Sequence, residues 1–200
     1  MDRQTRVAML VDHAKRPRHY GPLEDADVHM PGGNPGCGDI VTIHLKAEPG
    51  EDRIREVRFE GSGCTISQAA ASILAERINK RRATFDEVRA LSYEDMINVL
   101  GRDIVGSRPR CATLALGTLK AAVHRVEMDR KLRAAGRTDE EIERMRAILA
   151  AQAAGTGLVF GDDAVRAAQA PDSAAQAADS APQDGPSNPG SSDAGSNRAG

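Results

Sequence analysis

The hydrophobic pattern of this chain changes period once, and that change limits the possible folds more than any other feature. Ahead of residues 61–63, apolar side chains alternate with polar ones, as at Val41, Ile43 and Leu45. Strict alternation is typical of a half-buried strand. After these residues, from Cys64 on, apolar side chains recur near one helical face. The sequence therefore predicts strands in its first third and helices after them.

Three strands are expected. A short first strand is predicted around residues 26–30, and the second covers residues 41–46. The segment EPGED forms a turn, after which Ile54, Val57 and Phe59 indicate an antiparallel partner strand.

The expected helices carry apolar spacing, capping or glycine signals. They are an amphipathic helix over residues 5–14, a helix from Cys64 to about Ile78, two starts at Thr84 with Glu87 and at Ser92 with Asp95, a long helix from Cys111 closed by Gly136, and a last helix from Thr138 and Glu141 to near Gly155. A loop is predicted between Gly101 and Gly106, ahead of Pro109.

The end of the chain differs in composition. Beyond Val165 there is no further Val, Leu, Ile, Met or aromatic residue, so this segment buries too little apolar surface to offset its ordering entropy. The predicted organisation is a folded domain over residues 1–135, an additional C-terminal helix over 136–160 and a disordered tail rich in Ala, Ser, Pro and Gly over 161–200.

Charge and hydropathy favour a cytoplasmic protein with no nucleic-acid or membrane partner. The formal net charge is −2, from 27 basic and 29 acidic residues, and the basic residues form no excess that would attract nucleic acid. No apolar run approaches the roughly 20 residues of a membrane span. The first residues lack the apolar core of a secretory signal.

The three cysteines, Cys37, Cys64 and Cys111, are the candidate functional residues. An odd number in a reducing compartment argues against a disulfide framework. Cys64 and Cys111 lie at predicted helix N-termini, which favour thiolates, and Asp39 adds a hard oxygen donor beside Cys37. Three thiolates and a carboxylate suit tetrahedral zinc or an iron–sulfur cluster. The spacing matches no zinc finger, so three small buried hydrophobic residues are the alternative.

The neighbours of these cysteines add a family resemblance. The segments NPGCGDIV, FEGSGCTISQAAASIL and RPRCATLALGTLKAAV, in this order, resemble the three signature segments of the NifU N-terminal/IscU/SufU family, and VDHAKRPRHYGPL is similar to its opening segment. The resemblance covers roughly residues 5–125. It implies an α+β fold, a small antiparallel sheet of about three strands packed by helices, with the cysteines converging at one end.

The resemblance also implies a function. Family members accept sulfur from a cysteine desulfurase, assemble an iron–sulfur cluster and pass it to apo-proteins, so this chain is expected to be a scaffold and sulfur carrier and not an enzyme. Cys37, Cys64 and Cys111 fall on the family's cysteines, as ligands and persulfide-acceptor candidates, and Asp39 falls on its aspartate. The expected cofactor is a transient 2Fe–2S cluster, with zinc as an alternative occupant of the same site.

Two departures keep a second function open. IscU-type members carry a histidine immediately before the third cysteine, where this chain has Arg110, and DIVGSRPR does not reproduce the chaperone-binding motif of IscU. RCATL and GCTISQA are similar instead to the SufU branch, although the insertion usual in that branch is missing. The alternatives are a SufU-like, zinc-dependent persulfide acceptor that acts with a cysteine desulfurase, and a structural zinc-binding interaction module.

Other residues have weaker roles. Arg110 is expected to act electrostatically on a thiolate or to be a solvated charge. The histidines have no motif support as ligands, and His44 alternates onto the polar face of its strand. The last helix, with Ile142, Met145 and Leu149 at helical spacing, is expected to serve packing or self-association, and the oligomeric state is left open.

Overall fold

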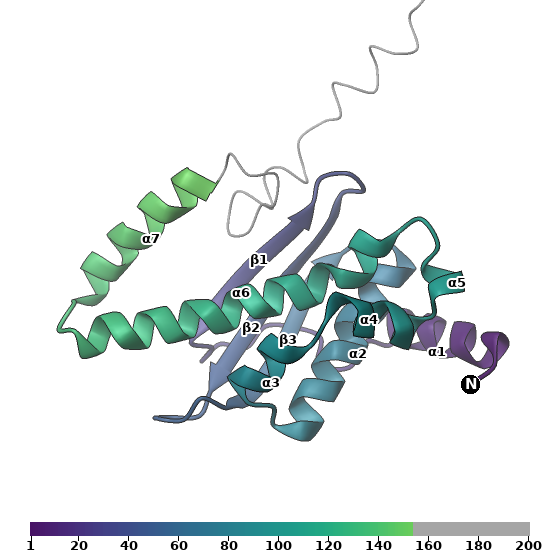
Figure 1. Ribbon diagram of the computed structural model, residues 1–200, viewed down its shortest axis with the longest axis horizontal. Coiled ribbons are helices and arrows are strands. Elements are labelled where there is room, and N and C mark those ends of the chain that lie inside the picture. Colours follow the sequence, from purple (N-terminus) through teal and green to yellow (C-terminus); the bar gives the residue numbers. More distant parts are fainter. Residues whose placement is uncertain (154–200) are drawn as a thin grey trace, which may run out of the picture. The chain divides into compact units, whose positions relative to one another are not determined.

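The computed structural model describes residues 1–153, with side chains described up to residue 148. The elements are α1 (Arg3–Lys15), β1 (Val28–Asn34), β2 (Asp39–Ala47), β3 (Ile54–Ser62), α2 (Thr65–Arg81), α3 (Phe85–Ala90), α4 (Tyr93–Leu100), α5 (Arg102–Val105), α6 (Pro109–Ala134) and α7 (Asp139–Ala153). Within these residues, α1 comes first, the three strands follow it, and the other helices come after the strands, as predicted (Figure 1). The predicted tail over 161–200 lies outside the described residues.

The sheet is antiparallel, in the order β1-β2-β3, which confirms the predicted fold class. Alternate residues of β2 and β3 face the helices, and there Ile43, Leu45 and Phe59 are almost fully buried. Helix α6 packs on β1 and β2, and α2 packs on β3 and on α6, so both cover the same face of the sheet (Figure 1). Helix α1 packs on α2. The core therefore lies between the sheet and helices α2 and α6.

Strand β1 is longer than predicted. It runs through Pro31, Gly32 and Gly33 to Asn34, residue types that are depleted in strands. Proline is tolerated because β1 lies at the edge of the sheet, where a missing N–H leaves no ladder bond unmade. Gly32 is required by packing, since a Cβ there would lie 2.1 Å from Thr118 Oγ1 on α6. This extension carries the chain directly into the loop that contains Cys37.

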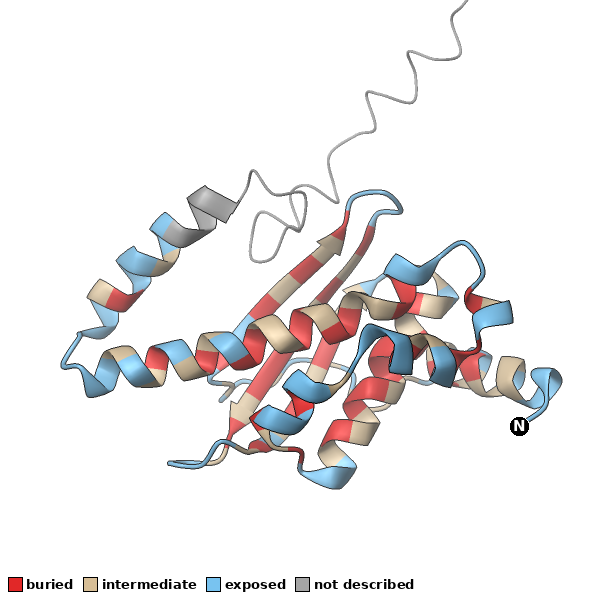
Figure 2. Ribbon diagram, viewed as in Figure 1, coloured by how far each residue is buried: buried red, intermediate tan, exposed pale blue. Residues whose placement is uncertain are grey.

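The long helix α6 presents one continuous apolar stripe to the core, and Figure 2 shows buried residues recurring along the helix. Its buried apolar residues recur three or four positions apart: Ala112, Ala115, Leu116, Leu119, Ala122, Val123 and Val126. Helix α2 contributes small residues to the same interface, including Ala69, Ala70 and Ala71. Small side chains allow the two helices and the sheet to approach closely.

The local signals for helix ends are confirmed. Thr84 with Glu87 and Ser92 with Asp95 form reciprocal capping boxes at α3 and α4. Thr138 and Glu141 make the same pair of hydrogen bonds at the start of α7. Gly136 follows α6 with a φ of 79°, which suits glycine.

One prediction of a loop was wrong. Residues between Gly101 and Gly106 form the short helix α5, flanked by these two glycines at positive φ. Four residues are too few for a helical period to be visible in a sequence. Burial of Val105 holds this turn against the core.

The final helix, α7, packs on the end of α6. Ile142 is buried there, whereas Met145 is exposed, and the side chain of Leu149 lies outside the described residues. Arg146 pairs with Asp129 of α6. Within residues 1–153, none of the helices combines the length and apolar character that a bilayer crossing requires.

Candidate metal centre

The four candidate ligands come from three places in the chain and meet at one end of the sheet. Cys37 lies in the β1–β2 hairpin, Asp39 is the first residue of β2, Cys64 caps the N-terminus of α2, and Cys111 lies in the first turn of α6. This hairpin and the starts of α2 and α6 are adjacent in Figure 1. Together they line an open cavity of about 580 Å³. The predicted convergence of the cysteines is therefore present.

The hairpin loop is shaped by Asn34 and by glycine. The carbonyl oxygen of Asn34 accepts hydrogen bonds from the amides of Cys37 and Gly38, at 3.1 and 3.0 Å. Gly38 has a φ of 67°, which a residue with a side chain rarely adopts. The Asn34 side chain accepts a third bond from the Gly36 amide, at 3.3 Å. These bonds turn the chain so that the sulfur of Cys37 faces the cavity.

The ligand atoms are close enough to share an ion. Cys37 Sγ lies 3.5 Å from Cys111 Sγ, and one ligand atom from each of Cys37, Asp39 and Cys111 lies within 4.8 Å of the others. Cys64 Sγ is 3.6 Å from Asp39 Oδ2 and so adjoins this group through the carboxylate. Three sulfurs and one oxygen fit a tetrahedral zinc ion or an iron–sulfur cluster with one oxygen ligand.

Asp39 is held as a carboxylate inside the protein, with only 2% of its surface exposed. Burial alone raises the pKa of this carboxyl, but hydrogen bonds from the Cys64 amide, from the Cys111 and Cys37 thiols and from the Ser67 hydroxyl lower it below its ordinary value. The bond from Cys64 N to Asp39 Oδ1 measures 2.9 Å. A charged oxygen ligand is therefore in place before any metal binds.

The thiols behave differently from the prediction based on helix position. Burial raises the pKa of the Cys111 thiol, and Asp39, Cys37 and Cys64 raise it further. Burial also raises the pKa of the Cys37 thiol, since its sulfur faces the cavity although the residue as a whole is exposed. The expectation that Cys111 is a good thiolate in the metal-free protein was wrong, because a neighbouring carboxylate and desolvation oppose the helix N-terminus.

The three cysteines differ in accessibility. Cys37 is exposed, Cys64 is intermediate, and Cys111 is buried with 3% of its surface exposed. A molecule that approaches from solvent therefore meets the Cys37 side of the site first.

Two neighbouring residues were not anticipated as part of the site. The amide of Asn34 points toward Cys111 Sγ, 4.0 Å away, and the Ser67 hydroxyl donates to the Cys64 carbonyl at 2.9 Å. Asn34 opens the segment NPGCGDIV and Ser67 lies in GCTISQA, so the motifs contained both. Polar residues that orient ligands become visible only when the fold places them beside the sulfurs.

Two arginines lie around the cavity. Arg108 and Arg110 line it together with Ser107 and Pro109, and both arginines are exposed. Arg110 is therefore at the cavity rim, where it adds positive charge near the thiols. No histidine lines the cavity in the part of the chain that the structure describes.

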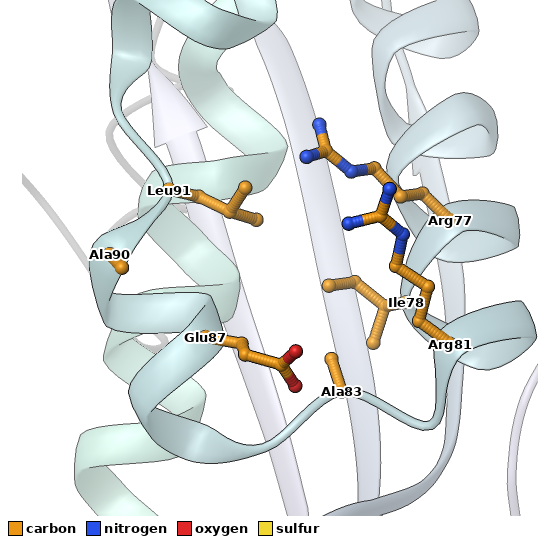
Figure 3. Close-up of a pocket in the computed structure, with 7 residues that line it drawn as sticks. All are labelled: Arg77, Ile78, Arg81, Ala83, Glu87, Ala90 and Leu91. Carbon is orange, nitrogen blue, oxygen red and sulfur yellow. The ribbon is translucent and has the colours of Figure 1, made fainter.

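A smaller cavity, of about 180 Å³, lies near the other end of α2, between that helix and α3 (Figure 3). Arg77 and Arg81 extend over it from α2, and Glu87 faces it from α3. The Glu87 carboxylate already accepts a hydrogen bond from the Thr84 amide, at 2.7 Å. With no thiol or histidine in its lining, this cavity lacks a donor set for metal.

Comparison with known proteins finds relatives among iron–sulfur cluster assembly proteins and their zinc-dependent counterparts. Residues 6–133 match the model of the NifU-like N terminal domain. An iron–sulfur cluster assembly scaffold protein IscU of Thermotoga maritima is 34% identical over 131 residues, covering 58% of this chain and 91% of that protein. The zinc-dependent sulfurtransferase SufU of Bacillus subtilis is 30% identical over 134 residues, covering 60% of this chain and 89% of that protein.

A solved structure shares the fold. The N-terminal part of a nitrogen-fixing NifU-like protein from Brucella abortus has a TM-score of 0.51 at 22% identity, covering 60% of this chain and 92% of that chain. The matched segment, residues 6–133, contains Cys37, Asp39, Cys64 and Cys111. The chain therefore belongs to the NifU-like N-terminal domain family.

Proposed function

We propose that this protein is an iron–sulfur cluster assembly scaffold, which receives sulfur and iron, holds the cluster and passes it to apo-proteins. The observation that carries the proposal is the meeting of three thiols and one ionised carboxylate in an open cavity. No histidine adjoins these thiols within the described residues, so the arrangement of a cysteine hydrolase, with its paired base, has no support. The site is suited to binding and release.

In this proposal Cys37, Cys64, Cys111 and Asp39 hold a transient cluster of the 2Fe–2S type, which is the cargo of the protein. Thiolates are soft ligands that iron–sulfur clusters prefer, whereas a carboxylate is a hard ligand. With one hard ligand among three soft ones, the bond from the carboxylate to the cluster is weaker than the bonds from the thiolates. One weaker bond suits a cluster that must be released to another protein.

Cys37 is proposed as the first sulfur acceptor, because it is the exposed thiol. Its sulfur attacks the terminal sulfur of a persulfide on a cysteine desulfurase. A new S–S bond forms on Cys37, the S–S bond of the desulfurase breaks, and the proton of the Cys37 thiol passes to the released desulfurase thiolate. Cys111 Sγ lies 3.5 Å from Cys37 Sγ and is placed to receive the sulfur next by the same exchange.

A zinc-dependent sulfur relay is the second candidate. It is favoured by Arg110 at the rim of the cavity and by the likeness to a SufU named as a zinc-dependent sulfurtransferase. In that case the same four residues hold zinc, which would keep the thiols deprotonated and in position. Both candidates need a cysteine desulfurase as partner, and both place the protein in the cytoplasm, where thiols stay reduced.

An anaerobic assembly assay separates the two candidates. The protein is incubated with a cysteine desulfurase, cysteine and ferrous iron, and cluster absorbance and transfer to an apo-ferredoxin are followed. A scaffold forms a cluster and transfers it, whereas a relay speeds cysteine turnover and carries persulfide with zinc retained and no cluster. Cluster formation that survives Cys64→Ser or Cys111→Ser unchanged would contradict the scaffold proposal.

Two variants refine the roles in the same assay. Cys37→Ser is expected to remove persulfide from the protein, as measured by mass spectrometry, whereas Cys111→Ser leaves persulfide on Cys37. Asp39→Ala is expected to leave sulfur acceptance intact and to lengthen the lifetime of the bound cluster, because the hard ligand is lost. His124→Ala, an exposed change on α6, is the control and should behave as the unmodified protein.

A further inference from the structure

Two histidines meet on the face of the sheet that the helices leave open. In the antiparallel register of β1 and β2, His29 lies directly opposite His44. Their Nδ1 atoms are 2.7 Å apart, and the ring centroids are 4.9 Å apart with the rings inclined at 73°. His29 is exposed, and His44 is buried with 5% of its surface exposed. The pair contains no cysteine and does not share the cavity of the metal centre.

A neighbouring carboxylate settles which nitrogens carry protons. Glu60 of β3 lies 3.0 Å from His44 Nε2, and an ionised carboxylate accepts hydrogen bonds and cannot donate them. His44 Nε2 therefore carries a proton, and in the neutral ring Nδ1 keeps its lone pair. The short contact with His29 then requires that His29 Nδ1 donates to His44 Nδ1. The two Nδ1 atoms thus face each other, one as donor and one as acceptor, with one proton between them.

The surroundings keep His44 neutral. Burial lowers the pKa of His44 below its ordinary value, and this outweighs the opposing effect of Glu60. His29 and Arg58, the residues that face His44 from β1 and β3, lower this pKa further. A neutral imidazole whose second nitrogen donates to a carboxylate is the form that binds metal ions in proteins.

We propose that His29 and His44 form a second metal site, which binds one divalent transition-metal ion of the nickel, copper or zinc class through the two Nδ1 atoms. Metal–nitrogen bonds of about 2.0–2.1 Å at right angles place two nitrogens about 2.9 Å apart. The observed 2.7 Å is close to this distance, and rotation of the exposed His29 ring would turn its Nδ1 from the hydrogen bond toward an ion held by His44 Nδ1. The ion takes the place of the shared proton, which passes by way of water to the free Nε2 of His29, so that both rings stay neutral, and water fills the other positions of the ion.

Glu60 is a positioning residue in this site, since it holds the ring of His44 with Nδ1 facing His29. Imidazole nitrogens suit borderline metal ions such as nickel, whereas the thiolates of the metal centre suit softer metal ions and iron–sulfur clusters. The two sites therefore differ in ligand chemistry, and the proposal does not depend on the proposed function.

Nickel binding tests the proposal in a chain without the thiol site. In Cys37→Ser/Cys64→Ser/Cys111→Ser, isothermal titration with Ni²⁺ is expected to show one equivalent of binding. Adding His29→Ala should weaken binding at least tenfold, and adding Glu60→Gln should weaken it about tenfold. Adding His124→Ala, which removes an exposed histidine outside the pair, should leave it unchanged. Equal binding with and without His29→Ala would overturn the proposal, as would absence of binding.

A second measurement uses the full chain and decides the matter even if the triple variant does not fold. The protein is first loaded with one equivalent of zinc, enough for the thiol site alone, and Ni²⁺ is then added while backbone and imidazole signals are followed by nuclear magnetic resonance. Paramagnetic broadening is expected around residues 28–30, 43–45 and 59–61, and the Cys37 and Cys111 signals should persist. Broadening centred elsewhere, or none at all, would refute a second site at the histidine pair.

Discussion

At the scale of single residues, the metal centre depends on atoms that touch the ligands as much as on the ligands. Asp39 stays charged because the Cys64 amide and the Ser67 hydroxyl stabilise its carboxylate against the cost of burial. Gly63 leaves room for this arrangement, since a Cβ there would lie 2.7 Å from Asp39 Oδ1 and 2.5 Å from Ser67 Oγ.

Gly63→Ala is therefore expected to displace the Asp39 carboxylate without removing any ligand. Zinc retention by the purified protein in the presence of a competing chelator should fall at least tenfold. Gly36→Ala is the matched control from the cysteine loop, because its added Cβ would meet Asn34 Oδ1 at an ordinary 3.6 Å. Equal zinc retention in the two variants would mean that Asp39 does not depend on Gly63.

The candidate ligands could be named from the sequence, whereas their chemical state could not. Cys37, Cys64, Cys111 and Asp39 stand in recognisable segments, and the structure brings them together. The raised pKa of Cys111 depends on burial and on a carboxylate far away in the chain, so no local pattern reveals it. The pairing of His29 with His44 was missed for the same reason, since it follows from strand register.

At the scale of elements, strands and helices depart from the local pattern where tertiary contacts decide. Alternation located the inner part of β2 and β3, and capping residues located the helix starts. Propensity did not predict that β1 continues through Pro31 to Asn34, because the pairing with β2 and the contact with α6 hold that segment extended. The same contacts set how tightly α6 approaches the sheet.

Gly32→Ala tests this close approach. The added Cβ would lie 2.1 Å from Thr118 Oγ1 and 3.1 Å from Thr118 Cβ, so the free energy of unfolding should fall by about 2 kcal/mol. Adding Thr118→Ala removes the nearest atom and should restore part of the loss, as measured by urea denaturation. A double variant no more stable than Gly32→Ala alone would show that the strain arises elsewhere.

The docking of α1 on α2 is expected to weaken in acid. His13 is buried there with Nδ1 2.8 Å from Ser72 Oγ, and burial lowers its pKa from 6.5, with Arg18 adding to the effect. The unfolded chain then binds the proton more readily, so stability is complete above about pH 6.5 and declines as the pH falls below it. Urea denaturation of the metal-free protein at pH 7.5 and pH 5.5 should show a smaller decline in His13→Gln than in the unmodified chain. An equal decline would assign the effect to other groups, of which His44 is one.

At the scale of the whole described domain, the candidate metal centre joins elements that otherwise meet through packing and a few hydrogen bonds. Its ligands come from the β1–β2 hairpin, the start of α2 and the start of α6. A bound ion therefore ties the end of the sheet to both covering helices. Helix α7 takes no part in this site. It packs on α6 through buried Ile142 and through the ion pair of Arg146 with Asp129.

Metal removal should accordingly destabilise the entire domain. With free zinc a thousandfold above its Kd, linkage predicts a gain of about 4 kcal/mol over the metal-free protein. Thermal denaturation in zinc and in excess chelator should show this as a higher Tm in zinc. Cys37→Ser/Cys64→Ser/Cys111→Ser should lose most of this rise in Tm and keep only the smaller part that the proposed histidine pair contributes, and a full zinc response in that variant would argue against the thiol site.

The unequal exposure of the three cysteines has a consequence for how cargo leaves. Cys37 faces solvent, whereas Cys111 is enclosed at the start of α6. A thiolate of a recipient protein can thus replace the outermost bond while the innermost one is still intact. Under the proposed function, we expect handover by stepwise ligand exchange through a complex in which both proteins hold the cluster, which would keep iron and sulfide out of water.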